Sequence, residues 1–415
     1  MMFFYQTGIH LYGFGARVAS LFSDKARKWV KGRKDWKASL RAKISDGNWI
    51  WFHCASLGEF EQGRKLMEEI RVKYPDYKLL LTFFSPSGYE IRKGYQGADH
   101  VCYMPLDTRS NVSSFLDIVQ PKMVFIIKYE LWLNYIFEAE RRGIPMFLVS
   151  ALVRESSKFL TSQLKGLYKK AFGAFSWIFT QDENSLKLLK AFAETDKLSV
   201  AGDTRFDRAA ELPAKWEAVP GIAEFVGEKR CIVVGSPWPK DEAVVLPAIA
   251  ALKDYDLKWI IAPHEIHPAE IDRHIRAYPG KMAKYSARDA ITSETDVLWI
   301  DNVGMLSRLY KYSTLVYIGG GFGTAIHNTQ EPAVYGNPVL FGPKFETFVE
   351  AVDMVQAGGA VSVQSTEEFV SAVKKWLDDP ELLAQTRAQN TAYMQSMAGA
   401  TEIVLRKLEA MQILP

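Results

Sequence analysis

One carboxylate near the start of the chain is placed where it could accept a proton from a substrate hydroxyl. The run HCASLGEF at 53–60 overlaps the end of an apolar stretch at 49–54 that predicts a strand. Small residues at Ser56 and Gly58 allow a tight strand-to-helix turn, after which Glu59 falls in the first helical turn. A carboxylate there could serve as a general base, although the positive end of the helix should favour its ionised form rather than raise its basicity. Ser56 and Glu59 also have the spacing of a capping box, which would explain both without catalysis.

Two further clusters of polar side chains lie at the ends of predicted strands. Ser85 and Ser87 lie in the run TFFSPSG at 82–88, and Glu130 lies in KYELWLN at 128–134. The serines could line the same site as the first carboxylate, and Glu130 could bind sugar hydroxyls or support a base. An ordinary turn between a strand and a helix explains the serines equally well.

A glycine-rich run in the second half of the chain could hold a phosphate. Residues 319–328 read GGGFGTAIHN after a predicted strand, and Glu331 and Pro332 follow. Glycines let backbone amides approach an anion, and the N-terminus of a helix adds partial positive charge. The spacing is not that of a dinucleotide fingerprint, because the later glycine does not fit. Asn328 suits a base or a phosphate and Glu331 suits ribose hydroxyls, but helix capping is an alternative explanation of the pair.

Two other runs raise the question of a metal ion. The run PHEIHP at 263–268 places two histidines beside Glu265, but a loop offers no helical face that would align them as ligands. The one Asp-x-Asp run, at 254–256, is typical of a solvated turn between a helix and a strand. No metal ion is therefore expected.

Charge and cysteine usage narrow the class of protein. The formal net charge of +3 over 415 residues is nearly neutral, so the overall charge indicates no particular partner. No nucleic-acid partner is expected. Cys54, Cys102 and Cys231 are far apart and odd in number, so neither a zinc site nor a disulfide framework is predicted. These features fit a reducing cytosol.

The elements that must position these side chains follow from the hydrophobic pattern. From Asn48 onward, short apolar runs alternate with amphipathic stretches, which is typical of βαβ units with parallel sheets. The predicted strands of a first series cover 49–54, 78–83, 123–128, 145–150, 177–180 and 198–201. Those of a second series cover 231–234, 258–262, 297–300, 315–318, 338–341 and 360–363. The main predicted helices cover 61–73, 241–252, 305–312 and much of 367–412.

The length of the chain predicts two domains, because 415 residues exceed what one hydrophobic core usually holds. The predicted divisions are an apolar and basic N-terminal segment at 1–46, a Rossmann-like domain at 47–205, a linker at 206–229, a second Rossmann-like domain at 230–395 and a C-terminal helix at 396–415. Ligands in such α/β sheets bind at the carboxyl ends of the strands, so we expect parallel sheets facing an interdomain cleft. This architecture is similar to the GT-B glycosyltransferase fold, to nucleotide-sugar epimerases and to enzymes like glycogen phosphorylase.

The N-terminal segment has the composition of a membrane-associating helix. Residues 1–22 are apolar and aromatic, but Gln6, His10 and Arg17 make them marginal for a membrane span. Residues 1–46 contain ten cations and three acids, which suits attachment to an anionic cytoplasmic leaflet. The alternative is a first helix packed on its own domain. No cleavable signal peptide is predicted, because no cationic region precedes the apolar stretch.

Taken together and in order, these motifs resemble the lipid A-specific Kdo transferase family, where Kdo is 3-deoxy-D-manno-octulosonic acid. Five segments carry the resemblance: 53–59 to Ala-Ser-x-Gly-Glu, 84–88 to Thr-Pro-Thr-Gly, 130–134 to Glu-Leu-Trp-Pro-Asn, 201–207 to Gly-Asn-x-Lys-Phe-Asp and 327–332 to His-Asn-x-x-Glu-Pro. Five matches in the same order along nearly the whole chain are far more specific than any one of them.

The resemblance implies an activity and a location. It implies inverting, metal-independent transfer of Kdo from CMP-Kdo to a lipid A precursor, lipid IVA, in the synthesis of the lipopolysaccharide core. No cofactor is implied beyond the donor substrate. The implied location is the cytoplasmic face of the inner membrane, with the 47–205 domain binding the acceptor and the 230–395 domain binding the CMP-sugar.

The resemblance also assigns roles to individual residues. Glu59 is implied as the base that deprotonates the acceptor hydroxyl. The implied nucleotide-binding residues are Pro263, His264, Val303, Gly304, Met305, Asn328, Thr329, Gln330 and Glu331. The candidates on the acceptor side are Ser56, Gly58, Ser85, Ser87 and Glu130.

Several positions depart from the family pattern. His264 stands where the family usually has Arg, so we expect the phosphate contact there to be weaker or pH-dependent. Met305 replaces a Glu, which leaves only the backbone for that contact. The other replacements are Leu133 for Pro, Leu152 for Arg and Arg205 for Lys.

Two other classes of function remain open on the residues alone. One is a GT-B enzyme that acts on a UDP-sugar, or an epimerase of similar architecture. The other is a non-catalytic, membrane-attached protein that binds a glycan or a nucleotide. A fold of this kind hosts many functions, so the architecture does not decide among them.

Overall fold

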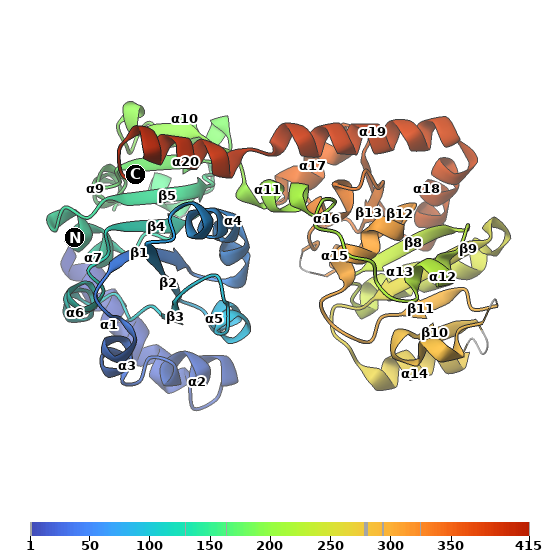
Figure 1. The fold of residues 1–415 in the computed structure, drawn as a ribbon, viewed down its shortest axis with the longest axis horizontal. Helices are drawn as coiled ribbons and strands as arrows, with labels where there is room; N and C mark the ends of the chain where they lie inside the picture. The colour runs from blue at the N-terminus through green and yellow to red at the C-terminus, as the bar shows by residue number, and fades with distance from the viewer. Residues whose placement is uncertain are drawn as a thin grey trace. The chain divides into compact units, whose positions relative to one another are not determined.

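The computed structural model describes residues 2–128, 130–162, 164–277, 281–292, 294–323 and 325–414. Tyr129 and Thr324, which belong to two of the predicted site runs, lie outside these ranges. The chain divides into two compact units (Figure 1). The first unit comprises Met1–Asp207 and Ala398–Pro415, and the second unit comprises Arg208–Met397.

The first unit contains a seven-stranded parallel sheet with the strand order β3-β2-β1-β4-β5-β6-β7. The strands are β1 Asn48–Cys54, β2 Tyr77–Phe83, β3 His100–Tyr103, β4 Met123–Ile127, β5 Met146–Ala151, β6 Trp177–Thr180 and β7 Leu198–Val200. Six of them were predicted to within about two residues at either end. The edge strand β3, whose residues alternate between partly buried and buried, was not predicted.

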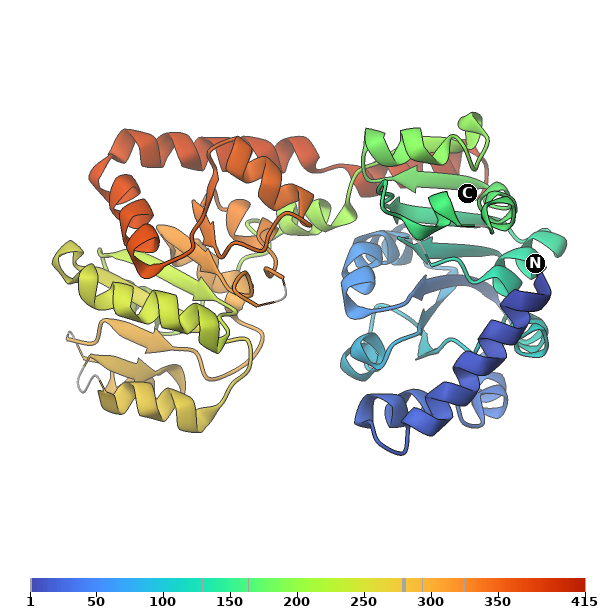
Figure 2. The ribbon, with the colours of Figure 1, turned by 180° about the vertical axis from the view of Figure 1, so that it is seen from behind.

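Helices cover both faces of this sheet (Figures 1 and 2). They are α1 Met2–Ala19, α2 Asp24–Lys31, α3 Trp36–Lys43, α4 Leu57–Lys73, α5 Pro86–Arg92, α6 Arg109–Val119, α7 Leu133–Arg141, α8 Lys158–Thr161, α9 Lys165–Gly173, α10 Glu183–Leu189, α20 Ala400–Ala410 and, across the boundary, α11 Thr204–Glu211. Trp51 belongs to the core on one face and Phe52 to the core on the other. Burial on both faces explains why these strands are nearly continuous apolar runs.

The C-terminal helix α20 belongs to the first unit. Val404, Leu405 and Leu408 pack into the same core as Phe60 of α4. The carboxylate of Asp207 accepts hydrogen bonds from the backbone N–H groups of Gly399, at 2.5 Å, and Thr401, at 2.6 Å. The chain therefore returns to its first sheet after completing the second.

The N-terminal segment forms three helices. Figure 2 shows α1 lying across the outside of the first unit. One face of α1 buries Ile9 and Gly13, while Phe3, Leu11 and Phe14 are 65–76% exposed. Within the described ranges, none of the helices combines the length and the hydropathy that crossing a bilayer requires.

The second unit contains another seven-stranded parallel sheet, with the order β10-β11-β9-β8-β12-β13-β14. Its strands are β8 Arg230–Gly235, β9 Leu257–Ala262, β10 Met282–Lys284, β11 Val297–Trp299, β12 Leu315–Ile318, β13 Val339–Phe341 and β14 Ala360–Ser362. Its helices are α12 Ile222–Val226, α13 Pro239–Ala251, α14 Pro268–Ala277, α15 Leu306–Leu309, α16 Gln330–Ala333, α17 Val349–Gln356, α18 Thr366–Asp378 and α19 Pro380–Met397. Only the three-residue strand β10 was not predicted. The α/β class with two Rossmann-like sheets is confirmed.

Candidate active site

Both sheets contain a point where their strand order reverses. It lies between β1 and β4 in the first unit and between β8 and β12 in the second. Ligands of open α/β sheets bind outside the carboxyl ends of the strands at such points. The loops after these four strands carry Glu59, Glu130, Trp238 and the glycine-rich run. The candidate base in the first unit and the glycine-rich run in the second therefore both lie where the fold favours a ligand-binding site.

Glu59 is held in the first turn of α4 and is 7% exposed. Its carboxylate accepts a 2.5 Å hydrogen bond from the backbone N–H of Ala55. Ser56 is the N-cap residue of α4, but its side chain makes no capping hydrogen bond. The reciprocal capping box that the spacing allowed is therefore not formed, and capping does not account for Ser56.

The surroundings of Glu59 make it a stronger base than its position on a helix suggested. Burial raises the pKa of Glu59 to about 7, and the charge of Glu130 also raises it, against the opposing effects of the Ala55 N–H and Lys128. The expectation that the helix end would dominate is wrong, because the loss of water around the carboxylate outweighs it. A carboxyl group with a pKa near neutrality is well suited to general-base catalysis.

Glu130 lies on the loop after β4, the neighbour of β1 in the sheet. Its side chain is partly exposed, and burial of the carboxyl group raises its pKa. Lys128 has a left-handed backbone, with φ 74°, at the point where the chain leaves the strand. Two carboxyl groups that influence each other take up protons as a pair, so Glu130 adjusts the basicity of Glu59.

The loop after β2 is tied to the loop that carries Glu59. The N–H of Ser85 donates a 2.7 Å hydrogen bond to the carbonyl oxygen of Ala55. The Ser85 hydroxyl caps α5 by accepting from the N–H of Ser87, at 3.3 Å, and lies 2.9 Å from the Ser87 hydroxyl. A turn with a helix cap therefore explains Ser85, while Ser87 is exposed. A Cβ atom added at Gly58 would meet no heavy atom within 4 Å, so this side of α4 is open.

The structure also assigns a role to Arg33, which the sequence grouped with the surface cations of the N-terminal segment. Arg33 is instead half-buried, and burial of its guanidinium lowers the pKa of that group to about 9. It donates hydrogen bonds to the carbonyl oxygens of Phe84, at 2.8 Å, and Met104, at 2.9 Å, and lies 3.9 Å over the ring of Trp29. Arg33 thus fastens the N-terminal helices to the loops after β2 and β3. This role is visible only in the folded structure, because the sequence around Arg33 resembles that around the other cations of the segment.

In the second unit, a buried carboxylate holds the two loops of the reversal point together. Asp241 of α13 is 0% exposed. It accepts hydrogen bonds from the N–H of Trp238, at 2.9 Å, the hydroxyl of Tyr317, at 2.7 Å, and the N–H of Gly320, at 2.9 Å. Sequence reasoning missed the role of Asp241, because the predicted helix began at Asp241 itself, whereas α13 has its N-cap three residues earlier, at Trp238.

The glycine-rich run is required by close backbone packing. A Cβ atom at Gly319 would lie 2.2 Å from the carbonyl oxygen of Ser236, and one at Gly321 would lie 2.6 Å from Gly342. Gly320 has φ 97°, and its Cβ would lie 2.2 Å from the carbonyl oxygen of Ala325. These contacts account for three of the glycines without any bound anion.

Three rings stack at the carboxyl edge of the second sheet. The ring of His264 lies 4.4 Å from that of His327 and 4.3 Å from that of Trp238. The indole N–H of Trp238 donates to Nε2 of His327, at 3.2 Å. Burial, together with the charge of His264, lowers the pKa of His327 to about 4. His327 is therefore neutral near pH 7 and carries its proton on Nδ1.

Residues 328–331 span the start of the short helix α16. The amide oxygen of Asn328 accepts from the N–H groups of Gln330, at 2.8 Å, and Glu331, at 3.2 Å. Helix capping therefore occupies this oxygen, as the alternative explanation predicted. Thr329 and Gln330 are each 1% exposed, and no described group bonds to their side-chain polar atoms. Burial raises the pKa of Glu331.

The remaining predicted nucleotide-binding residues lie at the ends of β9 and β11. Pro263 is the residue directly after β9. In the loop after β11, Val303 is 86% exposed and Gly304 has φ 89°. Met305 is 7% exposed, so its side chain is largely withdrawn from solvent.

Comparison with known proteins shows what the chain is similar to. The family model described as 3-deoxy-D-manno-octulosonic-acid transferase (kdotransferase) matches residues 27–208. A 3-deoxy-D-manno-octulosonic acid transferase of Rickettsia felis is 26% identical over 328 residues, which cover 78% of this chain and 70% of that protein. Another, of Chlamydophila psittaci, is 25% identical over 357 residues, which cover 84% of this chain and 80% of that protein.

The chain is a glycosyltransferase related to the Kdo transferases. A solved UDP-GlcNAc 2-epimerase from Neisseria meningitidis has the same fold, with a TM-score of 0.61 and 17% identity over 87% of this chain and 100% of that chain. The same fold in an epimerase shows that the architecture alone does not select the activity.

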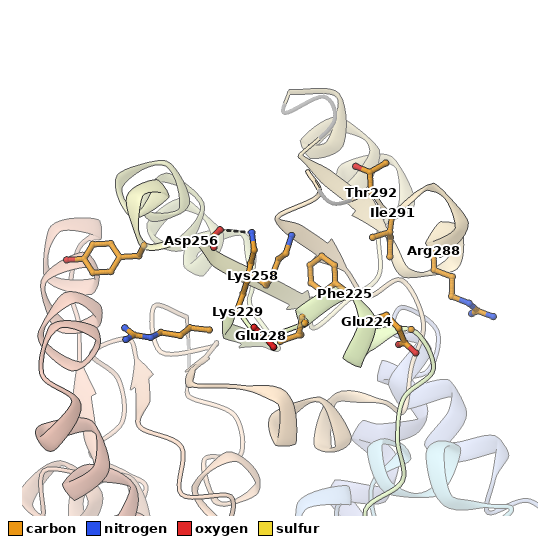
Figure 3. A pocket seen from close by; sticks show the side chains of 14 residues that line it. Glu224, Phe225, Glu228, Lys229, Asp256, Lys258, Arg288, Ile291 and Thr292 are labelled. Carbon is orange, nitrogen blue, oxygen red and sulfur yellow. Dashed lines mark hydrogen bonds and ion pairs between the residues drawn. The ribbon is translucent and has the colours of Figure 1, made fainter.

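One cavity lies away from the residues that the Kdo transferase resemblance assigns. It has a volume of about 1210 Å³ and lies at the amino ends of β8 and β9, next to α12 (Figure 3). Lys229 and Asp256 at its rim form a 2.5 Å ion pair, and Phe225 and Lys258 also line it. The size of this cavity does not make it the active site, because ligands bind at the opposite edge of such a sheet.

The described residues offer no ready-made metal site. Among them, no three or more His, Cys, Asp or Glu side chains gather where they could hold an ion. His267 pairs with Glu265 at 3.1 Å, and both side chains are 56% exposed. Asp256 is occupied by its ion pair, as expected of a turn residue.

Proposed function

We propose that the chain transfers Kdo from CMP-Kdo to lipid IVA, a lipid A precursor, in the synthesis of the lipopolysaccharide core. The transfer inverts the configuration at the donor carbon and uses neither a metal ion nor another cofactor. The observation that carries this proposal is the buried carboxyl group of Glu59, whose pKa of about 7 suits a general base. The similarity to Kdo transferases supports the choice of Kdo as the transferred sugar.

Glu59 takes the proton of the acceptor hydroxyl in this reaction. The acceptor oxygen forms a bond to the anomeric carbon of Kdo while the bond from that carbon to the phosphate oxygen of CMP breaks. The electron pair of the broken bond leaves with CMP, and attack from the opposite face inverts the carbon. Glu59 then returns its proton to solvent.

The second unit binds CMP in this proposal. His264 contacts the departing phosphate, and the neutral His327 ring stacked on it, at 4.4 Å, fixes its orientation. Glu331 binds the ribose hydroxyls. The binding residues assigned by resemblance, Pro263, Val303–Met305 and 328–331, supply the remaining contacts.

The N-terminal helices attach the enzyme to the cytoplasmic leaflet of the inner membrane. Support comes from the exposed side chains of α1, with Phe4 72% exposed, and from Phe22, which is 85% exposed. Lys25, Lys31 and Lys34 follow directly in the sequence and suit anionic lipid headgroups. Apolar insertion and cationic attraction together are the usual basis of interfacial binding.

The test is a direct assay of the purified protein with CMP-Kdo and lipid IVA. Mass analysis should show lipid IVA enlarged by Kdo, with an equal amount of CMP released. A parallel titration compares CMP with UDP, and we expect CMP to bind more tightly. Tighter UDP binding with no Kdo product would overturn the donor and the reaction. A separate flotation assay with anionic vesicles tests the membrane, and failure to float would overturn only the location.

A further inference from the structure

The buried face of α1 makes specific polar contacts with the start of α7. The hydroxyl of Tyr5 donates a 2.5 Å hydrogen bond to the carboxylate of Asp107. The same hydroxyl accepts from the backbone N–H of Leu133, at 3.2 Å. The side-chain amide of Gln6 donates to the amide oxygen of Asn134. Two successive side chains of α1 therefore reach the residues where α7 begins.

Asp107 takes the place of a helix cap for α7. The helix has Trp132 at its N-cap position, and that side chain makes no capping hydrogen bond. The carboxylate of Asp107 instead accepts from the N–H groups of Asn134 and Tyr135, both at 3.1 Å. The backbone carbonyl of Asp107 accepts from the side-chain amide of Asn134, at 2.5 Å. The free N–H groups at the start of a helix need such acceptors. Here the acceptors belong to Asp107, on a loop that is distant in the sequence.

Asp107 is fully buried, so its hydrogen bonds have no ready substitute from water. It is 0% exposed, and burial raises its pKa to about 7, against the opposing effects of Tyr5, Asn134 and Tyr135. Removing one partner of a buried polar group leaves the other unpaired, which costs more than the hydrogen bond contributes.

A chain of contacts leads from this cap toward the candidate base. Trp132 directly precedes α7, and its ring lies 4.4 Å from that of Phe84. Phe84 precedes Ser85, whose N–H donates to the carbonyl oxygen of Ala55, and the N–H of Ala55 donates to Glu59. The segment 130–132 between β4 and α7 also carries Glu130. A shift at the start of α7 would therefore reach both carboxyl groups of the site.

We propose that Asp107 and Tyr5 are positioning residues that fix the 130–134 segment for use of the acceptor. By this role α1 is part of the scaffold of the active site, in addition to any contact it makes with lipid. The proposal rests on the proposed function for its kinetic consequence only. Its structural consequence, a rigid start of α7, is independent of what the enzyme transfers.

The decisive variants are Asp107→Asn and Tyr5→Phe in the full-length protein. The Asn variant keeps the volume but replaces one acceptor oxygen by a donor, and the Phe variant removes only the hydroxyl. Matched controls are Asp76→Asn, an exposed acid of the same unit, and Tyr77→Phe, a partly exposed tyrosine on β2. Hydrogen–deuterium exchange of the peptide containing residues 133–135 reports the rigidity of the helix start. Steady-state kinetics then separates kcat and the KM values of acceptor and donor.

We expect both variants to speed exchange at 133–135 and to lower kcat/KM for the acceptor about tenfold. The KM for CMP-Kdo and the exchange of the second unit should stay unchanged, and the control variants should behave as the wild type. Unchanged exchange at 133–135 would overturn the proposal even if the wild type transfers Kdo. Faster exchange with unaltered acceptor kinetics in a wild-type-active enzyme would overturn the positioning role alone. Absence of Kdo transfer by the wild type would instead overturn the proposed function, while the exchange result still decides whether the cap exists.

Discussion

The first and second units share one architecture, but their ligand-binding edges treat a buried carboxylate differently. Glu59, 7% exposed, has few hydrogen-bond donors and a second carboxyl group, Glu130, close enough to raise its pKa. Asp241, 0% exposed, accepts hydrogen bonds from three donors, which lie on the loop after β8, on β12 and on the loop after β12. Burial and a second carboxyl group raise the pKa of Glu59, whereas Asp241 serves as a structural acceptor that links two segments of its unit. The same fold thus holds a carboxyl group with a raised pKa at this edge in one unit and a structural acceptor in the other.

The largest effect should come from removing the proton acceptor. Glu59→Gln keeps the size of the side chain and its contact with the loop but abolishes its basicity. We expect kcat to fall by about 10²–10⁴-fold, the usual contribution of general-base catalysis. Mass analysis of the Kdo product and released CMP measures the rate, and circular dichroism checks the fold.

The matched control for this variant is Glu183→Gln. Glu183 also lies in the first turn of a helix that follows a strand of the same sheet, but it is exposed. Its rate should equal that of the wild type. A Glu59→Gln enzyme that keeps full activity would show that Glu59 is not the base, and that part of the comparison between the two units would be wrong.

The second effect should come from weakening the framework of the other unit. Asp241→Asn retains the shape but replaces one acceptor oxygen with an NH₂ donor. This donor would face the N–H of Gly320 or Trp238, or the hydroxyl of Tyr317, which are donors themselves. We expect the free energy of unfolding to fall by about 1–3 kcal/mol, and CMP should bind less tightly because the glycine-rich loop loosens. Urea denaturation and calorimetric titration with CMP measure the two changes.

Asp254→Asn is the control, since Asp254 is an exposed residue of a 3-10 turn. It should change neither stability nor CMP affinity. If Asp241→Asn has the same free energy of unfolding as the wild type, the three hydrogen bonds do not stabilise the loops after β8 and β12.

The fold was largely predictable because the central strands are buried on both faces, and continuous apolar runs identify them without further information. The missed strands, β3 and β10, are short and lie at sheet edges. Length does not explain the two omissions, because β7 and β14 are equally short edge strands and were predicted.

The candidate site was predictable in location but not in electrostatics. The strand-end position of Glu59 follows from the pattern of apolar runs. Its raised pKa depends on burial and on Glu130, which is 71 residues away in the sequence and adjacent only in the folded sheet. Asp107 and Arg33 act through contacts of the same long-range kind, so local spacing gave no sign of their roles.

A third and smaller effect concerns the pH dependence of the rate. The base must be ionised, so kcat/KM should fall about tenfold per pH unit below the pKa of Glu59, which is about 7, and level off above it. Glu130→Gln removes a negative neighbour, so the pKa of Glu59 should fall and the acid limb should move to lower pH. A pH–rate profile of both enzymes measures the shift.

The same pKa has a consequence for stability. It is raised from 4.5, so the folded protein retains the proton at pH values where the unfolded chain has lost it. The contribution of Glu59 to stability is therefore present below about pH 4.5 and declines as the pH rises toward 7. Glu130→Gln should make this loss of stability with rising pH smaller. In the pH–rate profile, an acid limb that does not move in Glu130→Gln would show that the two carboxyl groups do not interact.

The smallest effect should come from the open side of α4. Gly58→Ala adds a Cβ atom that meets nothing within 4 Å, and it replaces glycine in the first turn of a helix. We expect stability to rise by up to about 1 kcal/mol, with little change in activity. Gly88→Ala is the matched contrast, because its Cβ would lie 2.2 Å from the ring of Phe83 and should destabilise the protein.

A bulkier side chain at the same position sharpens the test. Gly58→Leu should still fold, because the space is open, but it should raise the KM for the acceptor and leave the KM for CMP-Kdo unchanged. Thermal denaturation and kinetics with each substrate varied in turn separate the two consequences. If Gly58→Leu left both KM values unchanged, the acceptor would not pass the start of α4, and the open space there would have no part in the chemistry of Glu59.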